Sequence, residues 1–541
     1  MKKTIRIVIV VLLIIFGLFK FTEWYLEWRF EKLINKNPDR AYNITYNNFD
    51  LHTFFKGITL DKVEISPLNK TKGTLINGKV DYAELNGFVW TKFLFANSVK
   101  VNELQFVSPE FEINIVADST TKEKSEENSL QNLFSDILSR ADLDDFQISE
   151  GTITITENDS ILKGQVHNIN ISATEIETDS VKLTHIIPFQ LGNLEVELDS
   201  MSYQLNDYTK AKLGTFNYSI ADNSILVKDV SLLYDKDWVD ISKERGLQDD
   251  VIEFKLGTLK ISGMSFSSGF WSQLDIKARK MEIDSLSLGL RRNKNLQRPP
   301  DVEKPLFKGL VDKIPNKVDL DSIIIRNSAI GYGELSVHKQ HTGVIEINEI
   351  DGFITQFTTF PEQQRNYGSF EAHFNSKLNG AGTMGVHFSI PYEKEAFSLH
   401  TTLGPMNMTE LNSSLVPLLG VEFKEGSLHG LDFRMEAGYY QSQNHLAMDY
   451  ENFHLTIYKE ADDGSQHKQG FLSAIANTAI RHHNLPEDKH YIQAYYETPR
   501  NIYRSLFQHI VAGVLDGAKH IVPGKGVQSL INKDSKKKKK K

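Results

Sequence analysis

The sequence predicts a mostly β protein with helices at both ends. We expect an elongated, twisted β-groove of repeated strands, with an N-terminal transmembrane helix before it and a C-terminal amphipathic helix after it. Three observations predict this fold class. A block at Leu133–Ile153 returns without a gap at Leu310–Ile330, with seven of 21 residues identical. Apolar and polar residues alternate from Tyr42 onward, which is typical of half-buried strands. An uninterrupted apolar run stands near the N-terminus.

The apolar run Ile7–Phe19, flanked by Arg6 and Lys20, predicts a membrane-spanning signal anchor. A cleavable signal peptide is the alternative, but no small-x-small cleavage site follows the run. Aromatic residues of the kind found at a membrane interface follow instead. These are Phe21, Trp24, Tyr25 and Trp28. Basic residues precede the run, so we expect a cytoplasmic N-terminus. Residues 1–35 are predicted to be the anchor and a juxtamembrane helix.

Several later segments share one spacing, in which apolar residues stand three and then two positions apart. They are Leu60–Ile65, Val101–Phe106, Val166–Ile171, Val227–Leu232, Ile283–Leu288, Leu320–Ile325 and Tyr450–Leu455. Side chains alternate between the two faces of a strand, so a spacing of three predicts a bulge or turn at each site. Residues 36–116 are predicted to be the first β segment.

Residues 117–290 and 291–497 are predicted to be two related halves of the groove. Each half begins with a charged or polar linker and a short amphipathic helix, and the duplicated block follows. The linkers are residues 117–129 and 291–305, and the helices are Leu130–Leu138 and Leu306–Ile314. Such a repeat is typical of a quasi-one-dimensional architecture that works through a continuous surface.

Residues 498–541 are predicted to form a C-terminal amphipathic helix and a tail. Thr498–Pro499 is a good helix start, since proline is favoured at the first helical position. Gly513 and Gly517 give a weak signal for the close approach of another helix. The helix and the basic tail Lys536–Lys541 either touch an anionic membrane or cap the open end of the sheet, and the sequence favours neither reading.

Composition excludes several classes of function. The chain has 541 residues, a hydrophobic content of 40% and a formal net charge of −9. The hydrophobic content is ample for a folded core, and the acidic balance argues against nucleic acid as a partner. There is no cysteine, which rules out disulfides, thiolate metal sites and cysteine nucleophiles.

Two acidic pairs and three histidines are the candidates for chemistry. They are Asp142 with Asp144, Asp319 with Asp321, and His482, His483 and His490. We interpret the acidic pairs as turn residues before strands, because they lack calcium-loop spacing. We interpret the histidines as part of a solvated loop, because their spacing matches no zinc pattern. We therefore expect no enzyme, no catalytic residue, no cofactor and no metal.

The alternating apolar rows have two readings that periodicity does not separate. They form either an ordinary core between two sheets, or one curved face left partly open for acyl chains. The residues predicted for the open face are Leu104, Phe106, Phe111, Ile113, Phe146, Ile148, Ile153, Ile323, Ile325 and Ile330. On that reading, aspartate at Ile148 and Ile325 abolishes lipid retention.

Four stretches, together with the anchor, carry a family resemblance. They are Tyr42–Tyr46, Gly57–Pro67, Lys313–Tyr332 and Tyr503–Gly513. In these stretches the chain resembles the AsmA-like envelope proteins of Gram-negative bacteria, the wider group that includes TamB, and most of all the Bacteroidota-type members. The resemblance implies a β-groove body in the periplasm, anchored in the inner membrane. It also implies phospholipid transport between the two membranes and a role in outer-membrane integrity.

We therefore expect a single-pass inner-membrane protein with its body in the periplasm. Its expected partners are phospholipid or another acyl lipid, the inner membrane, and an outer-membrane or other envelope protein. The alternative is a non-enzymatic scaffold that tethers an envelope assembly partner through its sheet edge by strand addition.

Overall fold

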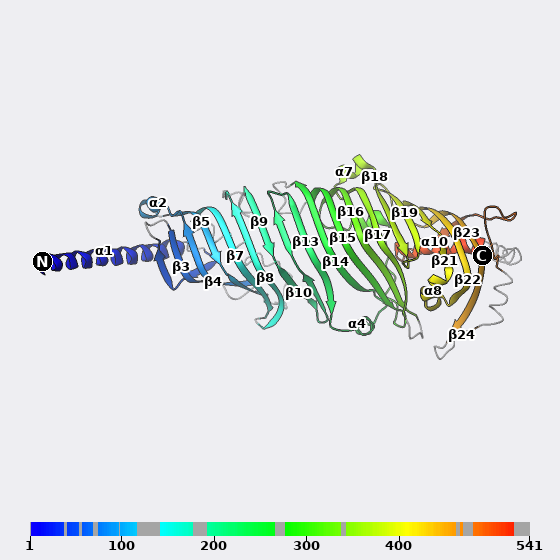
Figure 1. Cartoon of the computed structure of the whole chain (residues 1–541), viewed down its shortest axis with the longest axis horizontal. Coiled ribbons are helices and arrows are strands. Elements are labelled where there is room, and N and C mark those ends of the chain that lie inside the picture. Colours follow the sequence, from blue (N-terminus) through cyan, green and yellow to red (C-terminus); the bar gives the residue numbers. More distant parts are fainter. Residues whose placement is uncertain are drawn as a thin grey trace. The chain divides into compact units, whose positions relative to one another are not determined.

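The computed structural model describes most of the chain in twelve stretches. They are residues 2–36, 40–52, 57–68, 74–96, 98–115, 141–158, 160–176, 192–265, 276–336, 342–460, 466–468 and 480–523. The predicted linker 117–129, the predicted helix Leu130–Leu138 and the basic tail Lys536–Lys541 lie outside these residues. The described residues form two compact units, Met1–Lys228 and Asp229–Lys541, each built mostly of strands (Figure 1). The mostly β fold class is confirmed.

Among its described residues, unit 1 begins with the helix α1 (Lys2–Ile34), carries one short helix, α2 (Trp90–Phe95), and consists otherwise mainly of strands. Its strands are β1 (Tyr42–Thr45), β2 (Asn48–Leu51), β3 (Gly57–Pro67), β4 (Thr74–Asn86), β5 (Val99–Val107), β6 (Glu110–Ile115), β7 (Ala141–Glu157), β8 (Ile161–Thr174), β9 (Asn193–Leu198), β10 (Ser200–Asn206), β11 (Thr209–Leu213) and β12 (Phe216–Ser219). Most pairings are antiparallel, and β1 and β2 both pair with β3. Ser108 and Pro109 separate β5 from β6.

The two units divide between Lys228 and Asp229, inside β13 (Ser224–Tyr234). Unit 2 holds the longest strands, five short α-helices or 3₁₀ turns and one longer helix among the residues described. Its elements are α4 (Trp238–Arg245), β14 (Val251–Ser265), β15 (Ile276–Asn293), α6 (Phe307–Val311), β16 (Val318–Leu335), β17 (Thr342–Thr358), α7 (Pro361–Tyr367), β18 (Ser369–Leu378), β19 (Gly382–Pro391), β20 (Phe397–Leu403), β21 (Met406–Asn407), η3 (Met408–Leu411), α8 (Asn412–Leu419), β22 (Val421–Ala437), β23 (Gln441–Glu460), β24 (Gln466–Lys468), β25 (Ala494–Pro499) and α10 (Leu506–Ile521).

The predicted strand irregularity is confirmed at five of the seven segments. The third residue of each of these five has a positive φ, between 50° and 59°, in the left-handed region. These residues are Lys62, Asn168, Asp229, Ser285 and Asn452. A left-handed residue turns the strand over, so apolar side chains three positions apart reach the same face. Val101–Phe106 and Leu320–Ile325 contain no positive-φ residue, and there the predicted irregularity stays a prediction.

The strand part of the duplicated block, which is described in both copies, folds in the same way in both units. Its first strand residues, Ala141 and Val318, are equivalent in the repeat, and they begin β7 and β16. Each of these strands pairs in parallel with an earlier strand, β7 with β5 through Val99↔Ala141 and β16 with β15 through Ile276↔Val318. Equivalent positions later in the block also carry left-handed residues, Glu150 with φ 56° and Asn327 with φ 48°. The sequence repeat is thus a structural repeat. The predicted division into two sequence-related halves stays a prediction.

The C-terminal part differs from its prediction at the start of the helix. Thr498 and Pro499 end strand β25 instead of beginning a helix. The helix α10 starts after Ser505, whose hydroxyl caps it by accepting a hydrogen bond from the Gln508 amide at 3.3 Å. Proline is tolerated in β25 because it stands at the last residue of the strand, where the ladder ends.

Candidate functional site

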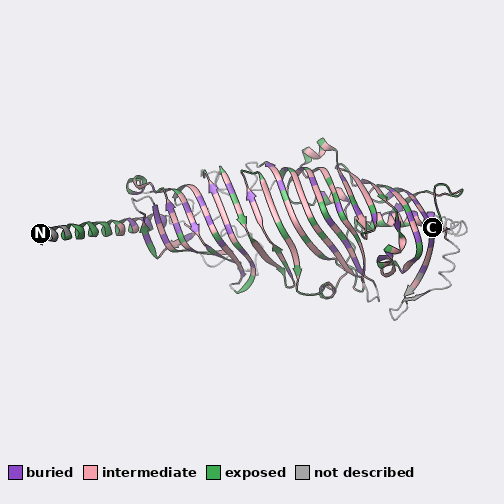
Figure 2. Ribbon diagram, viewed as in Figure 1, coloured by how far each residue is buried: buried purple, intermediate pink, exposed green. Residues whose placement is uncertain are grey.

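One face of the unit 2 sheet carries rows of apolar side chains that cross neighbouring strands. Paired residues lie on the same face, so the strand register defines each row. One row crosses β14 to β18 and consists of Phe254, Leu288, Ile330, Ile347 and Leu378. All five are half-buried or exposed, and Ile330 keeps 40% of its surface accessible. Figure 2 shows mostly intermediate burial along β14 to β17. This row is therefore open.

The same face is closed at the C-terminal strands, where α10 packs on it. Phe433, Leu446 and Ala494 pair across β22, β23 and β25, and all three are buried. A Cβ added to Gly513 would stand 3.0 Å from Phe433 Cζ, and one added to Gly517 would stand 2.6 Å from Leu446 Cδ2. The glycine pair thus lets the helix approach the sheet closely. We had predicted that it would let another helix approach. The helix thus lies on a face of the sheet, and both readings of its role, the membrane contact and the cap on the open end of the sheet, stay predictions.

Apolar side chains also lie on the exposed side of α10. They are Phe507, Val511 and Leu515. The predicted amphipathic character of this helix stays a prediction.

The structure brings the predicted open-face residues of unit 1 together. Register pairs them as Leu104↔Phe146, Phe106↔Ile148 and Phe111↔Ile153. Six of the seven candidates in this unit are buried: Leu104, Phe106, Phe111, Ile113, Phe146 and Ile148. The seventh, Ile153, is half-buried. In this part of unit 1 the apolar rows form a packed core.

The three candidates of unit 2 are less enclosed. Ile323 is buried, Ile325 is half-buried and Ile330 is exposed. The accessible part of the apolar face is therefore near Ile325 and Ile330. Their role in holding a lipid stays a prediction.

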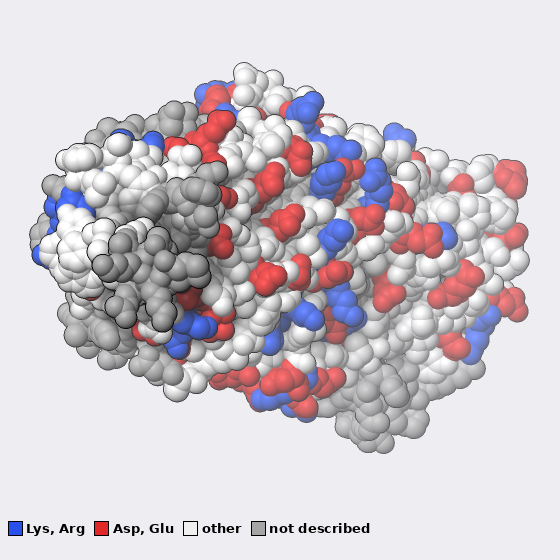
Figure 3. Space-filling view, turned by 60° about the vertical axis from the view of Figure 1, so that its left-hand side comes forward, with Lys and Arg blue, Asp and Glu red and all other residues white. Residues whose placement is uncertain are grey.

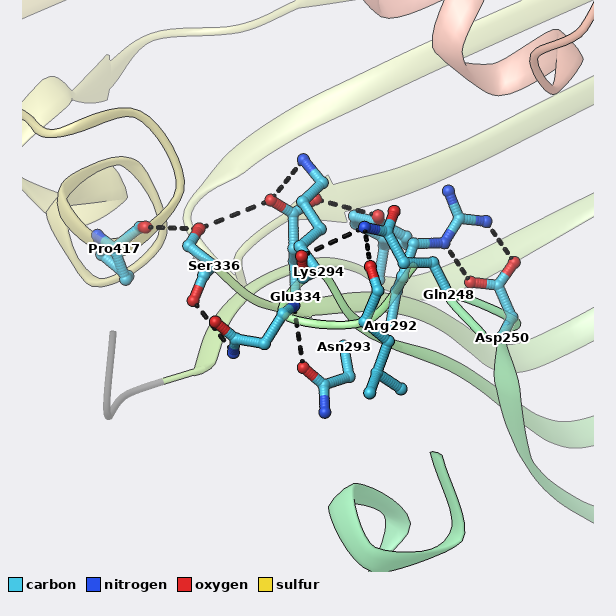
Figure 4. Close-up of polar contacts among 11 residues, drawn as sticks. Gln248, Asp250, Arg292, Asn293, Lys294, Glu334, Ser336 and Pro417 are labelled. Atoms are coloured by element: carbon cyan, nitrogen blue, oxygen red, sulfur yellow. Dashed lines mark hydrogen bonds and ion pairs between the residues drawn. The ribbon is translucent and has the colours of Figure 1, made fainter. Parts of the chain in front are cut away.

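Polar side chains form a network where β14 begins and β15 and β16 end (Figure 4). The Arg292 guanidinium donates two hydrogen bonds to the Asp250 carboxylate, at 2.8 and 2.6 Å. This is the bidentate geometry that gives arginine–carboxylate pairs their strength. Arg292 also lies over the Tyr332 ring, 5.9 Å from its centroid.

We call this set of polar residues at the ends of β15 and β16 the rim network. Glu334 is its most buried charged group. Its carboxylate lies 2.5 Å from Lys294 Nζ and accepts a hydrogen bond from the Tyr332 hydroxyl at 3.0 Å. Burial, followed by the nearby Glu334 charge, raises the pKa of Tyr332. The Ser336 hydroxyl donates to the Pro417 carbonyl at 3.4 Å and so joins the network to α8.

The rim network holds the strand ends and pairs each of its charges. The Gln248 amide donates to the carbonyls of Lys294 and Leu296 at 3.0 and 2.6 Å. Arg292 and Lys294 lie within the predicted linker 291–305, which is fixed to the sheet at this end. Because its acidic and basic groups pair with one another, we interpret the network as structural: it holds the ends of the strands together.

The two acidic pairs lie inside strands, Asp142 and Asp144 in β7 and Asp319 and Asp321 in β16, so the prediction that they are turn residues before strands is wrong. Asp142 and Asp144 face lysine side chains on neighbouring elements. Lys92 lies 3.0 Å from Asp142, and Lys100 lies 3.4 Å from Asp144. The hydrogen bond from Lys92 lowers the pKa of Asp142. In the other repeat, burial raises the pKa of Asp319.

The predicted histidine loop is not a metal cluster in the described part of the chain. His482 Nδ1 lies 2.8 Å from the Phe453 carbonyl oxygen, and its ring stacks on His454. His483 and His490 are exposed. The described group with ligand atoms close enough for a metal is Glu371, His373 and His387, within 4.8 Å of one another.

Sequence reasoning missed this second group because its members lie on two strands. The sequence does contain a signal for this group. Glu371 and His373 stand two residues apart in one apolar-polar alternating segment, and His387 stands in the next such segment.

Charged side chains of both signs are spread over the face of the molecule in view in Figure 3. No family model matches this chain, and no curated protein matches it either.

The N-terminal helix divides into a bare part and a packed part. Among the described residues, α1 is the helix long and apolar enough to cross a membrane, over Ile9–Ile34. Its apolar side chains from Ile9 to Phe19 are exposed. Leu26, Phe30 and Ile34, spaced four apart, are buried against unit 1. The bare part is an apolar surface that water disfavours.

The packed part of α1 is joined to α2 and to the first strands. Arg29 donates to the carbonyls of Phe93 and Leu94 at 3.1 and 3.0 Å. The Asn35 side chain donates to the Ile44 carbonyl at 2.9 Å. At the end of α2, Phe95 is 84% exposed. Exposed aromatic residues thus occur on α2 as well as on α1, where Trp24 and Trp28 are exposed.

Proposed function

We propose that this chain is a single-pass inner-membrane protein whose β body lies in the periplasm and holds the acyl chains of phospholipid against an apolar sheet face. The observation that carries the proposal is the open row Phe254, Leu288, Ile330, Ile347 and Leu378 in unit 2. Burial of acyl chains against such a row is favourable by about 25 cal/mol per Å² of apolar surface removed from water. The resemblance to AsmA-like envelope proteins supports the same reading.

One part of the apolar face is covered and another part is accessible, and this contrast argues that a ligand occupies the open row. α10 covers the row at β22 to β25, whereas β14 to β17 keep similar side chains accessible. A face intended only as a core gains stability from being covered along its whole length. In the proposal, an acyl chain supplies the missing cover while its head group stays in water.

A photo-crosslinking experiment tests the proposal at two positions on the adjacent strands β16 and β17. Ile330 and Phe353 are similarly exposed, at 40% and 44%, but lie on opposite faces of the unit 2 sheet. Phe353 stacks on His373 of the polar face, whereas Ile330 pairs with Ile347 of the apolar face. A photoreactive phenylalanine is placed at either position in the full chain, in membranes that carry radiolabelled phospholipid.

We expect labelled lipid to cross-link at position 330 and not at position 353. Equal labelling at the two positions indicates non-specific contact and contradicts the proposal. The absence of label at position 330, in a variant that is inserted and folded, contradicts it as well. Phe433, buried under α10, provides a third position at which we expect no label.

The second candidate function is a scaffold that binds an envelope partner by strand addition. The position of β25 favours it. Among the described strands, β25 pairs in register with β23 along one of its edges. Tyr495 in the middle of β25 is 77% exposed. Exposed strand edges are templates for pairing with another chain. Cross-links from position 495 to a protein, without lipid at position 330, favour this candidate.

A further inference from the structure

Glu371, His373 and His387 form a compact group of ligand atoms on the polar face of the unit 2 sheet. Glu371 and His373 stand two residues apart on β18, so their side chains share a face. His387 lies directly opposite His373 on β19. Their ring centroids are 4.0 Å apart, and His387 Nε2 lies 2.9 Å from Glu371 Oε2. The ligand atoms of all three lie within 4.8 Å of one another.

Neighbouring side chains hold this group in place. The hydroxyls of Ser389 and Ser369 donate to Glu371 Oε1 at 2.7 and 3.1 Å, which leaves Oε2 turned toward His387. His373 is stacked between the rings of Phe353 and His387. In the described part of the structure, the His373 ring nitrogens take part in no hydrogen bond. Partners that orient a ligand carboxylate in this way are typical of metal sites.

We propose that Glu371, His373 and His387 bind a divalent transition-metal ion of the Zn²⁺ class. Two imidazoles and one carboxylate suit zinc and its neighbours, whereas calcium and magnesium prefer oxygen ligands. Ligand atoms around a tetrahedral ion with bonds of about 2.0 Å lie about 3.3 Å apart. The observed separations between ligand atoms are at most 4.8 Å. Rotation of the side chains, with the strands fixed, shortens them to this value. Three protein ligands leave a fourth position for water or an anion.

The site is independent of the open apolar row. Ala372 and Phe374 alternate with Glu371 and His373 along β18, so the metal ligands face away from the apolar side. A bound ion links β18 to β19, and it stabilises the folded state because the unfolded chain lacks the assembled site. The alternative is a hydrogen-bonded and stacked cross-strand pair without an ion, which the experiment below distinguishes.

Metal titration of the full chain, purified in detergent without a polyhistidine tag, tests the site. The protein is stripped with a chelator, then titrated with Co²⁺ and followed by its visible d–d absorption. Zn²⁺ affinity is measured by competition with a chromophoric chelator. We expect a single tight equivalent in the wild type. Removal of a ligand in His373→Ala or His387→Ala weakens binding by about 100-fold or more, which exceeds the 10- to 100-fold effect of second-shell partners.

Two further variants separate a lost ligand from a lost fold. Glu371→Gln keeps the size and the serine hydrogen bonds of the side chain but removes its charge, so it folds and binds Zn²⁺ more weakly. His445→Ala lies in the same sheet face outside the group, and it binds like the wild type. Zn²⁺ raises the unfolding temperature of the wild type and of His445→Ala, but not of the ligand variants. A wild type without a tight equivalent, or ligand variants that bind equally well, overturns the proposal.

Discussion

Tyr450 and Phe453 stand three residues apart on one strand, yet their rings stack with centroids 3.9 Å apart. In a regular strand, residues three apart point to opposite faces. Asn452, with φ 56°, turns the chain over between them, and both rings are buried on the same side. The same device on β3, β8 and β15 keeps apolar residues on one face across a spacing of three.

Replacement of Asn452 tests this device directly. Asn452→Val places a β-branched residue at positive φ and lowers the free energy of unfolding by about 1–3 kcal/mol. Asn452→Gly keeps the conformation accessible and leaves stability within about 1 kcal/mol of the wild type. Chemical denaturation of both variants provides the comparison. Equal stability of the valine and glycine variants contradicts the account.

Aspartate substitutions at Ile148 and Ile325 now have different expected outcomes. Ile148 is buried in the unit 1 core beside Phe106, so Ile148→Asp destabilises the fold by about 3–5 kcal/mol. Ile325 is half-buried on the open face, so Ile325→Asp costs less stability and lowers lipid cross-linking at position 330. Thermal unfolding separates the two effects. A smaller loss of stability at Ile148 than at Ile325 rules out the packed core in unit 1.

The contact between α10 and the sheet depends on Gly517. A Cβ there would lie within 2.6 Å of Leu446 Cδ2, so Gly517→Ala forces the helix away from β23 and β25. We expect a loss of about 1–3 kcal/mol, despite the higher helix propensity of alanine. Lys519→Ala, on the exposed side of the same turn, is the neutral control. Hydrogen exchange of the α10 amides measures the effect, and unchanged protection in Gly517→Ala argues against close packing.

Acid sensitivity is expected from His509 on α10. Burial, followed by the positive charge of Arg500, lowers the pKa of His509 to about 4. In the unfolded chain its pKa is about 6.5, so the unfolded state binds more protons between these values. The free energy of unfolding therefore falls as the pH is lowered from about 6.5 to about 4. Denaturation at several pH values checks this, and His509→Leu has the flatter profile if His509 is the cause.

The exposed end of α2 is expected to touch the membrane interface beside α1. Phe95 is 84% exposed, and Arg29 of α1 bonds to the carbonyls of its neighbours Phe93 and Leu94. Aromatic side chains favour the interfacial region of a bilayer. A spin label at position 95 should be reached more readily by oxygen than by a water-soluble nickel chelate. The same label at position 495 serves as the reference, and equal accessibility at both positions refutes the contact.

Local sequence signals predicted much of the fold, and non-local ones predicted little. The spacing of Leu60, Val63 and Ile65 was sufficient to indicate an irregular strand, because side-chain direction is a local property. The Thr498–Pro499 signal was misleading, because a proline that opens a helix and one that ends a strand look alike in sequence. The Thr498 hydroxyl accepts a hydrogen bond from Asn444, 54 residues earlier, at 3.0 Å. No local pattern contains that partner.

The candidate sites show the same limit. Periodicity identified Ile325 and Ile330 as members of an apolar face, but exposure depends on what covers the face, and α10 covers only part of it. The pairing of His373 with His387 depends on strand register, which is set by the whole hairpin. Strand pattern therefore predicted which side a residue faces, and tertiary packing decided whether it is accessible.

The continuity of α1 has a mechanical consequence. Its 33 residues form one helix about 50 Å long, whose second half is buried in unit 1 at Leu26, Phe30 and Ile34. No break separates the exposed half of this helix from the half that packs on unit 1. In the proposed membrane-anchored protein, a thinner or thicker bilayer that changes the tilt of α1 would therefore also turn the strands that α1 contacts. On this proposal, membrane thickness influences the direction in which unit 1 points.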